Sequence, residues 1–284
     1  MYAQGYIPQK AILIKTHTHI LMQLSILGTG WLGLPLAKAL LAEGFAVKGS
    51  TTTPEKITSL REAGIEPFVL DLENFNMNAV TNFFKGSDIL IINIPPQVKA
   101  SEVTYADRLS QLLPFIGQEG ISKVLFVSST SVYVDDNNLV TEFTLPNPET
   151  ESGKQVLAAE LLFEEATNFK TTILRFGGLT GESRQPVKFM AGKENIANPD
   201  APVNLIHQDD CIGIILKIIA KDSWGEVFNA VSPNHPSREV YYTTKAKEMN
   251  LPLPKFNHSE TSTGKTVVGD KVVEVLGYEY KITI

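Results

Sequence analysis

The chain has 284 residues, of which 43% are hydrophobic, 8% aromatic and 20% charged, and 31 acidic against 25 basic residues give a formal net charge of −6. This composition is typical of a globular protein and excludes a disordered, collagen-like or disulfide-scaffold chain. The excess of acid argues against nucleic acid as a partner. The only cysteine, Cys211, excludes an intrachain disulfide and a cysteine-rich metal site, so we expect a cytoplasmic protein without a metal.

The first apolar run, residues 11–28, is interrupted by Lys15, His17 and His19. A membrane-spanning helix needs ~20 mostly uncharged residues, so we expect neither a membrane anchor nor a signal peptide. Met22 stands directly before the first clear strand pattern. Residues 1–21 are therefore either an extension from an upstream start or carry an extra strand over 11–15, and both alternatives stay open.

Short apolar segments then alternate with segments of helical periodicity. Strands are predicted at 24–27, 46–49, 66–70, 89–94, 123–128, 172–175 and 227–230. Helices are predicted at 32–43, 54–63, 78–84, 103–116, 153–168 and 209–221. Several strands are almost continuously apolar, which is typical of parallel strands covered on both faces. The alternation predicts an α/β fold with a doubly wound parallel sheet.

The first strand runs into a GxGxxG motif, which also opens the first helix. The motif consists of Gly28, Thr29, Gly30, Trp31, Leu32 and Gly33. In that context the glycines allow a tight turn, close approach of a diphosphate and close packing of the helix on the sheet. We therefore predict a Rossmann-type dinucleotide-binding domain over 22–176 that includes the strand at 226–231. The looser segments 177–225 and 232–284 are predicted to form a small substrate-binding lobe.

The end of the second strand bears on the choice of cofactor. An NAD site usually has an acid there, whereas this chain has Ser50, Thr51, Thr52 and Lys56. These groups favour NADP over NAD, although no arginine accompanies them. Two further strand ends are predicted to touch the cofactor: Asp71 and Leu72 beside the adenine, and Asn93, Ile94 and Pro95 beside the nicotinamide ribose.

Four segments carry a resemblance to a known family: 126–133 with its SSxxVY pattern, 174–181, 203–210 and 226–229. In order and spacing they resemble the extended short-chain dehydrogenase/reductases, which include NAD-dependent epimerases and dehydratases. The chain is most similar to a bacterial subgroup that lacks the YxxxK pair. The resemblance implies a small-molecule substrate such as a nucleotide sugar, and a homodimer formed through the helices at 103–116 and 153–168.

In that family a serine, a tyrosine and a lysine carry the chemistry. The resemblance places the serine at Ser129 and puts Ser128 beside the cofactor. The YxxxK pair should open the helix that follows, where the two possible registers supply Ser152 with Val156 or Thr150 with Lys154. Neither register has a phenol, so we expect Ser152 to be the N-cap of this helix.

Other phenols are candidates for the proton donor. Tyr133 is nearest to Ser129 in sequence and is predicted to be catalytic with it, while Tyr105 is a weaker candidate. Two YxxxK strings, which begin at Tyr6 and Tyr241, lie outside the expected helix and are taken as chance matches. Arg184 and Lys188 either hold a substrate phosphate or are solvated loop charges, and the second alternative is favoured.

These observations predict an NAD(P)-binding oxidoreductase or epimerase/dehydratase with a non-standard catalytic centre. The alternative is an NAD(P)-binding sensor or regulatory protein on the same fold that catalyses no reaction.

Overall fold

The computed structural model describes residues 22–96 and 103–284. The predictions for residues 1–21 lie outside these ranges. A seven-stranded sheet runs through the molecule in the order β10-β7-β5-β4-β1-β2-β3, and every neighbouring pair is parallel. Its strands are β1 (Gln23–Leu27), β2 (Ala46–Thr51), β3 (Glu66–Val69), β4 (Ile89–Ile92), β5 (Lys123–Ser129), β7 (Lys170–Phe176) and β10 (Val227–Ala230). The predicted doubly wound α/β fold is confirmed.

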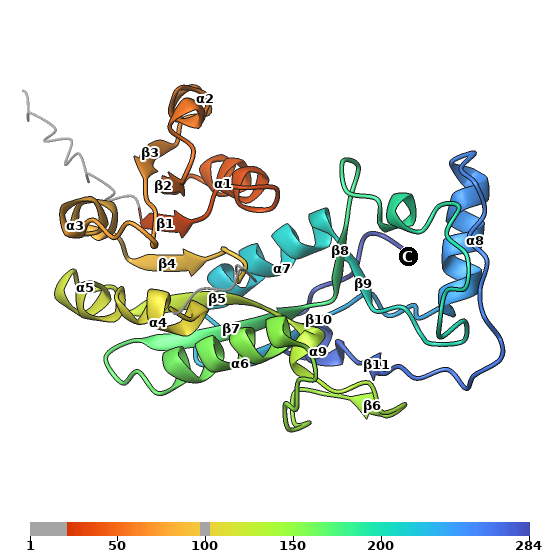
Figure 1. Cartoon of the computed structure of the whole chain (residues 1–284). Helices are drawn as coiled ribbons and strands as arrows, with labels where there is room; N and C mark the ends of the chain where they lie inside the picture. Colours follow the sequence, from red (N-terminus) through yellow and green to blue (C-terminus); the bar gives the residue numbers. More distant parts are fainter. Residues whose placement is uncertain (1–21, 97–102) are drawn as a thin grey trace, which may run out of the picture.

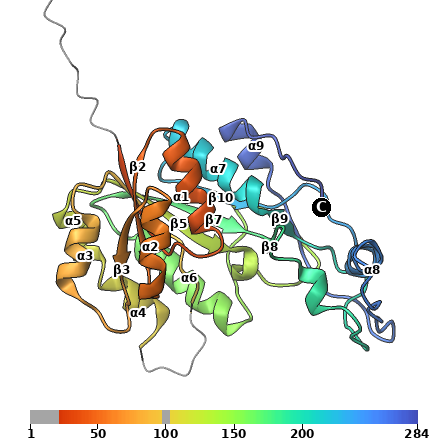
Figure 2. The same ribbon diagram turned by 90° about the horizontal axis from the view of Figure 1, so that it is seen from above.

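Helices cover both faces of this sheet (Figure 1). One face carries α1 (Gly33–Ala42), α2 (Ile57–Glu62), α7 (Gln208–Ala220) and α9 (Asp270–Leu276). The other face carries α3 (Met77–Phe84), α4 (Tyr105–Ser110), α5 (Leu113–Gln118) and α6 (Glu151–Glu164). Figure 2 shows the sheet between α7 and α9 on one side and α6 on the other.

The sequence of β4 explains why two cores form. Its side chains alternate between the faces, so that Ile89 and Ile91 enter the core under α1 while Leu90 and Ile92 enter the core under α6. All of these side chains are almost completely buried. A strand covered on both faces needs apolar residues at every position, which is why its sequence is a continuous apolar run.

Two predicted helices differ in the structure. The helix predicted at 103–116 is divided into α4 and α5, because Pro114 at the start of α5 lacks an N–H and its ring would collide with the carbonyl group of Ser110 in a continuous helix. The helix predicted at 153–168 begins earlier, at Glu151. Its N-cap is Thr150, whose Oγ1 accepts from the N–H of Gly153 at 3.1 Å, so the prediction of Ser152 as N-cap is wrong.

Smaller elements gather beyond the carboxyl ends of the central strands. They are β6 (Leu139–Val140) paired with β11 (Thr266–Val267), β8 (Gly178–Thr180) paired with β9 (Leu205–His207), and α8 (Arg238–Glu248). Short 3-10 turns lie at Pro54–Lys56, Thr130–Val132 and Pro186–Phe189. In both views α8 lies at the opposite end of the molecule from α3 and α5 (Figures 1 and 2).

Helix α7 packs on the sheet and lies within the segment 177–225 that is predicted to form part of the small lobe. Its Ile214, Ile215 and Ile218 are fully buried in the same core as Leu36 and Leu40 of α1. Because α7 packs on the sheet, fewer residues are left to pack around α8. There Tyr241 packs with Val203 and Leu205, and all three residues are distant in sequence from β5, the strand that ends at Ser129. In the described ranges, 22–96 and 103–284, no helix is long and apolar enough to cross a membrane.

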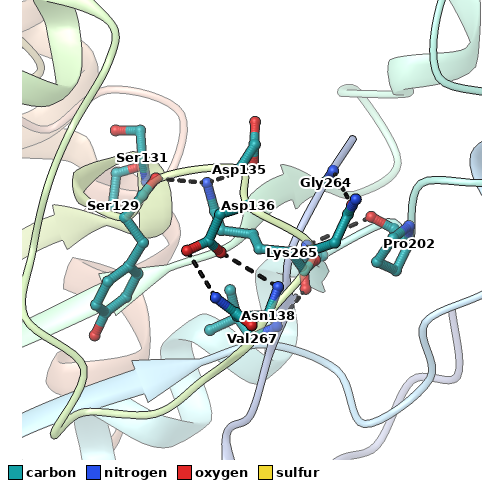
Figure 3. A network of polar contacts seen from close by, with 12 residues as sticks. Ser129, Ser131, Asp135, Asp136, Asn138, Pro202, Gly264, Lys265 and Val267 are labelled. Carbon is teal, nitrogen blue, oxygen red and sulfur yellow. Dashed lines mark hydrogen bonds and ion pairs between the residues drawn. The ribbon is translucent and has the colours of Figure 1, made fainter. Parts of the chain in front are cut away.

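The loop that follows β5 is tied to a segment near the C-terminus (Figure 3). Lys265 donates from Nζ to the carbonyl oxygen of Tyr133 at 2.8 Å and to Asp135 Oδ1 at 2.9 Å. The neighbouring Asp136 accepts from both the N–H and the side-chain amide of Asn138, and these two bonds form a turn after Tyr133. These bonds fix the loop that leaves the end of β5, where Ser129 lies.

A buried ion pair joins α6 to β7. The guanidinium of Arg175 donates to both carboxylate oxygens of Glu160, the shortest contact being 2.6 Å, and the two side chains are only 5% and 0% exposed. Burial alone would lower the pKa of Arg175, but the hydrogen bonds and charge of Glu160 raise it above its ordinary value. A buried ion pair of this kind is stable only while both partners are present, so each side chain needs the other.

Replacing Glu160 with glutamine should lower the free energy of unfolding by about 3–5 kcal/mol, because it leaves the Arg175 charge buried without a counter-ion. The measurement is urea denaturation followed by circular dichroism. The matched control is Glu248→Gln, which breaks an exposed pair with Lys245 and should change stability little. Equal losses in the two variants would contradict this account of the ion pair.

Candidate functional site

The glycine loop between β1 and α1 lies directly against the end of β4. Gly28 has φ +99°, and a Cβ there would lie 2.6 Å from both the carbonyl oxygen of Asn93 and Cγ2 of Ile94. Gly33 is pressed against the carbonyl oxygen of Gly28. Asn93 braces the loop by donating from Nδ2 to that same oxygen at 3.1 Å. Side chains at these glycines would push the loop away from the sheet.

The same loop presents unpaired backbone donors. The N–H groups of Gly28 and Thr29 are bonded to Ser50, through its Oγ at 2.9 Å and its carbonyl at 2.8 Å. The N–H groups of Gly30, Trp31 and Leu32 have no acceptor within the described part of the chain. Free donors at the start of a helix, together with its dipole, form a site for an anion such as a diphosphate.

A cavity of about 270 Å³ opens on one side of this loop. Among its lining residues are most of the predicted cofactor contacts: Gly28, Thr29, Gly30, Ser50, Thr51, Thr52, Lys56, Asp71, Leu72, Asn93, Ile94 and Pro95. They come from the ends of β1, β2, β3 and β4. The carboxyl ends of parallel strands meet at one edge of the sheet, and this arrangement brings the predicted residues together.

Three of the charged side chains of this cavity, Asp71, Glu73 and Arg108, are held by hydrogen bonds or an ion pair. Asp71 accepts from Asn74 Nδ2 at 2.8 Å and from the Glu73 N–H at 2.9 Å, and these bonds lower the pKa of its carboxyl group. Arg108 pairs with Glu73 at 3.2 Å. Sequence reasoning missed Arg108, which α4 brings to the cavity from a distant part of the chain.

A second cavity, of about 410 Å³, adjoins the first and shares Gly30, Asn93, Ile94, Pro95 and Tyr105 with it. Its other lining residues include Trp31, Leu32, Val127, Ser128, Ser129, Val156, Leu179 and Arg184. The two predicted serines and the remaining predicted glycine-loop residues thus lie here. Gly33 lines neither cavity and instead supports Gly28 from behind.

The two serines differ in what they offer to this cavity. Ser128 donates its hydroxyl proton to Glu160, whose carboxylate is already held by Arg175, so only its lone pairs remain available. Ser129 accepts the N–H of Ser131 at 3.1 Å, which leaves its own O–H free. Ser128 is therefore an acceptor toward the cavity, whereas Ser129 is a donor.

Tyr133 lies apart from both cavities, with a side chain that is 2% exposed. Its hydroxyl accepts from Arg175 Nη1 at 2.7 Å and donates to Asn229 Oδ1 at 2.9 Å. Burial raises the pKa of this phenol, and Arg175 offsets only part of the rise. The hydroxyl of Tyr133 thus already donates one hydrogen bond and accepts another. The catalytic role predicted for Tyr133 gains no support from this position.

Helix α6 presents an apolar side chain to the second cavity. Val156, which takes the lysine position in the register that begins at Ser152, is buried in the lining, whereas Lys154 is exposed. The phenol of the lining is Tyr105, whose hydroxyl donates to the carbonyl oxygen of Ile94 at 2.6 Å. Burial raises the pKa of Tyr105 above its ordinary value.

Two lining residues were not singled out in the sequence. Val127 and Leu179 lie within the segments that carry the family resemblance, but as apolar residues of strands they are typical core positions. Tyr105 offers a weak signal because Thr104 and Asp107 form a capping box that fixes the start of its helix.

The free N–H groups and the room kept by Gly28 fit the diphosphate of a dinucleotide, which defines the chain as a dinucleotide-binding protein of the Rossmann type. Residues 28–207 match the family described as NAD(P)H-binding. The chain belongs to this NAD(P)H-binding family.

The chain is similar to protein YeeZ of Escherichia coli K12, with 33% identity over 269 residues, 91% of this chain and 96% of YeeZ. Its fold is similar to that of UDP-glucuronic acid 4-epimerase from Bacillus cereus in complex with NAD, with TM-score 0.77, 20% identity and coverage of 92% of both chains. It is also similar to a short-chain dehydrogenase/reductase superfamily protein from Agrobacterium tumefaciens with bound NAD, with TM-score 0.75, 17% identity and coverage of 92% and 93%.

Replacing Gly28 with alanine should abolish NADH binding, because the new Cβ would meet the backbone of Asn93 and displace the loop that holds the diphosphate. The matched control is Gly44→Ala, at φ +87° with open space around it, which carries the same left-handed strain without the collision. NADH binding is measured by fluorescence titration of the folded variants. Equal affinity of the two variants would contradict the close approach at Gly28.

Proposed function

We propose that the chain is an NAD(P)-dependent enzyme that acts on a sugar-like substrate with a reactive hydroxyl or carbonyl group, held against Ser129 in the second cavity. The observation that carries this proposal is the adjacency of the two cavities, one at the glycine loop and strand ends, the other at the paired serines. A nicotinamide ring placed between Asn93, Ile94 and Ser128 would face a substrate beside Ser129.

A bound nicotinamide supplies hydride transfer at its C4 atom. The free O–H of Ser129 would donate to the substrate oxygen and stabilise the negative charge that develops there. The acceptor Ser128 would receive a hydrogen bond from a carboxamide or hydroxyl group. In the direction of alcohol oxidation the substrate hydroxyl would give its proton to Ser129 Oγ while the proton of Ser129 would pass to water, and the bound nicotinamide would be the acceptor of the hydride from the substrate carbon.

Tyr133 is assigned a stabilising role in this proposal, because its hydroxyl bridges Arg175 and Asn229 in the core. Bound water is the alternative proton donor, and the lining of the second cavity favours it over a phenol. Val156 in its wall supplies no cation that would lower the pKa of a phenol there.

Replacing Ser129 with alanine should lower kcat by about 10²–10³-fold, because it removes the hydrogen bond to the developing oxyanion. The affinity for NADH should stay within about twofold, since other residues hold the dinucleotide. The assay follows NADH oxidation and hydrogen-isotope exchange over a panel of sugar nucleotides and carbonyl compounds.

Binding of the dinucleotide without turnover of any compound in this panel would contradict the proposed enzymatic activity. It would favour the alternative, an NAD(P)-binding sensor protein. A folded Tyr133→Phe variant that loses turnover as completely as Ser129→Ala would return the proton-donor role to Tyr133.

The proposal favours NADP over NAD. Ser50, Thr51 and Thr52 offer hydroxyl groups at the end of β2, and Lys56 lies in the same wall. Asp71 is turned toward Asn74 and the Glu73 N–H, so its carboxylate is engaged away from a ribose hydroxyl. A 2′-phosphate would find hydroxyl donors and one cation here.

Replacing Lys56 with glutamine should weaken NADPH binding about tenfold and leave NADH binding within about twofold, because only NADPH carries the phosphate that the ammonium would bind. The control is Lys38→Gln, an exposed lysine of α1 outside both cavities. Dissociation constants of both cofactors are measured by fluorescence. Tighter binding of NADH than of NADPH by the wild type would contradict the preference.

Besides the substrate, we propose a second copy of this chain as a partner. The two copies would contact each other through α4, α5 and α6. The surface of α6 includes Leu161, whose side chain is 48% exposed.

We further propose that the protein works in the reducing cytoplasm, where its buried, free Cys211 needs no partner.

A further inference from the structure

The loop that follows β6 carries large apolar side chains that lie exposed. The side chain of Phe143 is 95% exposed and that of Leu145 is 85% exposed, and Leu139 of β6 is also largely exposed. Neither of the two cavities described above includes these residues. Single exposed apolar residues are ordinary, whereas several on one short segment are typical of an interaction surface.

A tight turn brings these side chains together. Thr144 donates its N–H to the carbonyl oxygen of Thr141 at 3.1 Å, and Thr141 donates its own N–H to Thr144 Oγ1 at 3.0 Å. In a turn closed in this way the first and fourth Cα atoms lie within about 7 Å of each other. Leu139 and Leu145 therefore flank the turn and Phe143 lies within it, and we call these three residues the apolar turn.

The apolar turn is anchored to the rest of the fold on two sides. Glu142 accepts the N–H of Asn229, in β10, with its Oε1 at 2.8 Å. Val268, directly after β11, donates its N–H to the carbonyl oxygen of Val140 in β6 at 2.8 Å. The exposure of Phe143 is thus part of a fixed arrangement, and a preorganised surface loses less entropy when it binds a partner.

The charge around the apolar turn has one sign. Residues 135–151 contain five acidic residues and no basic one. One of these acids, Asp135, pairs with Lys265. The exposed acids of this segment that form no ion pair with another residue of the described ranges are Asp136, Glu149 and Glu151. The apolar turn therefore lies in a locally negative surface.

This combination of negative charge and apolar surface selects among the possible partners. The acids would repel the phosphates of a nucleic acid or of an anionic membrane. A protein segment with cationic and apolar side chains would instead pair its charges with the acids and bury Phe143 and Leu145. The surface is also separate from the proposed contact between copies, because β6 lies at the lower edge of the molecule in Figure 1 and α4 and α5 lie at the left.

We propose that the apolar turn, together with the acids around it, is a docking surface for a basic, apolar segment of a partner protein. Phe143 would contribute most of the affinity, because large aromatic side chains at the centre of an interface typically do. The acids would orient the partner and accelerate the encounter. This inference is independent of the proposed enzymatic activity, since it uses neither cavity.

The test is titration of the full chain with labelled amphipathic peptides, followed by fluorescence anisotropy. One peptide carries leucine on one face of a helix and lysine on the other, and the second has the same pattern with glutamate in place of lysine. The leucine–lysine peptide should bind the wild type at least about tenfold more tightly, because only its charges are complementary to the acids. A double variant, Phe143→Ser with Leu145→Ser, should bind it at least about tenfold more weakly, because the apolar contacts are lost.

The matched control is Phe189→Ser, which removes a phenylalanine that is 73% exposed in a different turn of the chain. It should leave the affinity for the leucine–lysine peptide within about twofold of the wild type, because it lies outside the interface. Replacing both Glu149 and Glu151 with glutamine should weaken binding and reduce its dependence on salt concentration. Circular dichroism checks that each variant is folded.

Three results would overturn the inference. The first is a wild type that binds neither peptide or binds both equally. The second is a folded double variant with unchanged affinity, or a loss of affinity in Phe189→Ser that is as large. The third is a wild type that sediments as a dimer while the double variant sediments as a monomer, which would identify the apolar turn as an interface between two copies. Absence of turnover would contradict the proposed enzyme alone, because the titration does not depend on catalysis.

Discussion

The buried ion pair between Arg175 and Glu160 is the constraint on which the site depends. It joins β7 to α6 across the end of the sheet, and both partners extend its influence. Glu160 accepts a hydrogen bond from the hydroxyl of Ser128, and Arg175 donates one to the phenol oxygen of Tyr133. The hydrogen-bonding character of the cavity wall therefore follows from a charge pair that does not itself line either cavity. Its desolvation is expensive, and the complete pairing of both groups offsets that expense.

The glycine loop is the second organising feature, and it works through close approach. Gly28 and Gly33 let the turn lie against Asn93, which places the start of α1 at the edge where four strands end. The same loop continues into Trp31, whose ring contacts the segment that begins beyond β8. A single tight turn thus supports both the dinucleotide side and the substrate side of the site, so that displacing it would disturb both.

Periodicity and motif spacing were enough to predict the sheet and the glycine-loop and strand-end residues that line the first cavity. The predicted strands are present in order, because continuous apolar runs such as that of β4 have few structural alternatives. The division of α4 from α5 required attention to Pro114, and the N-cap at Thr150 required geometry that spacing does not determine. Arg108 could not be assigned to the site, because only tertiary packing brings its helix to the first cavity.

The chemistry of the second cavity follows from what replaces the usual cation beside the serine. Val156 makes that part of the wall apolar, and the phenol of Tyr105 is already donating to Ile94. A nearby ammonium would normally lower the pKa of a phenol toward neutrality, and burial without one raises it instead. Proton transfer by a side-chain phenol is therefore disfavoured at this site. The neutral donor Ser129 is the group that this wall offers to a substrate oxygen, and the proposed enzyme needs water as its proton carrier.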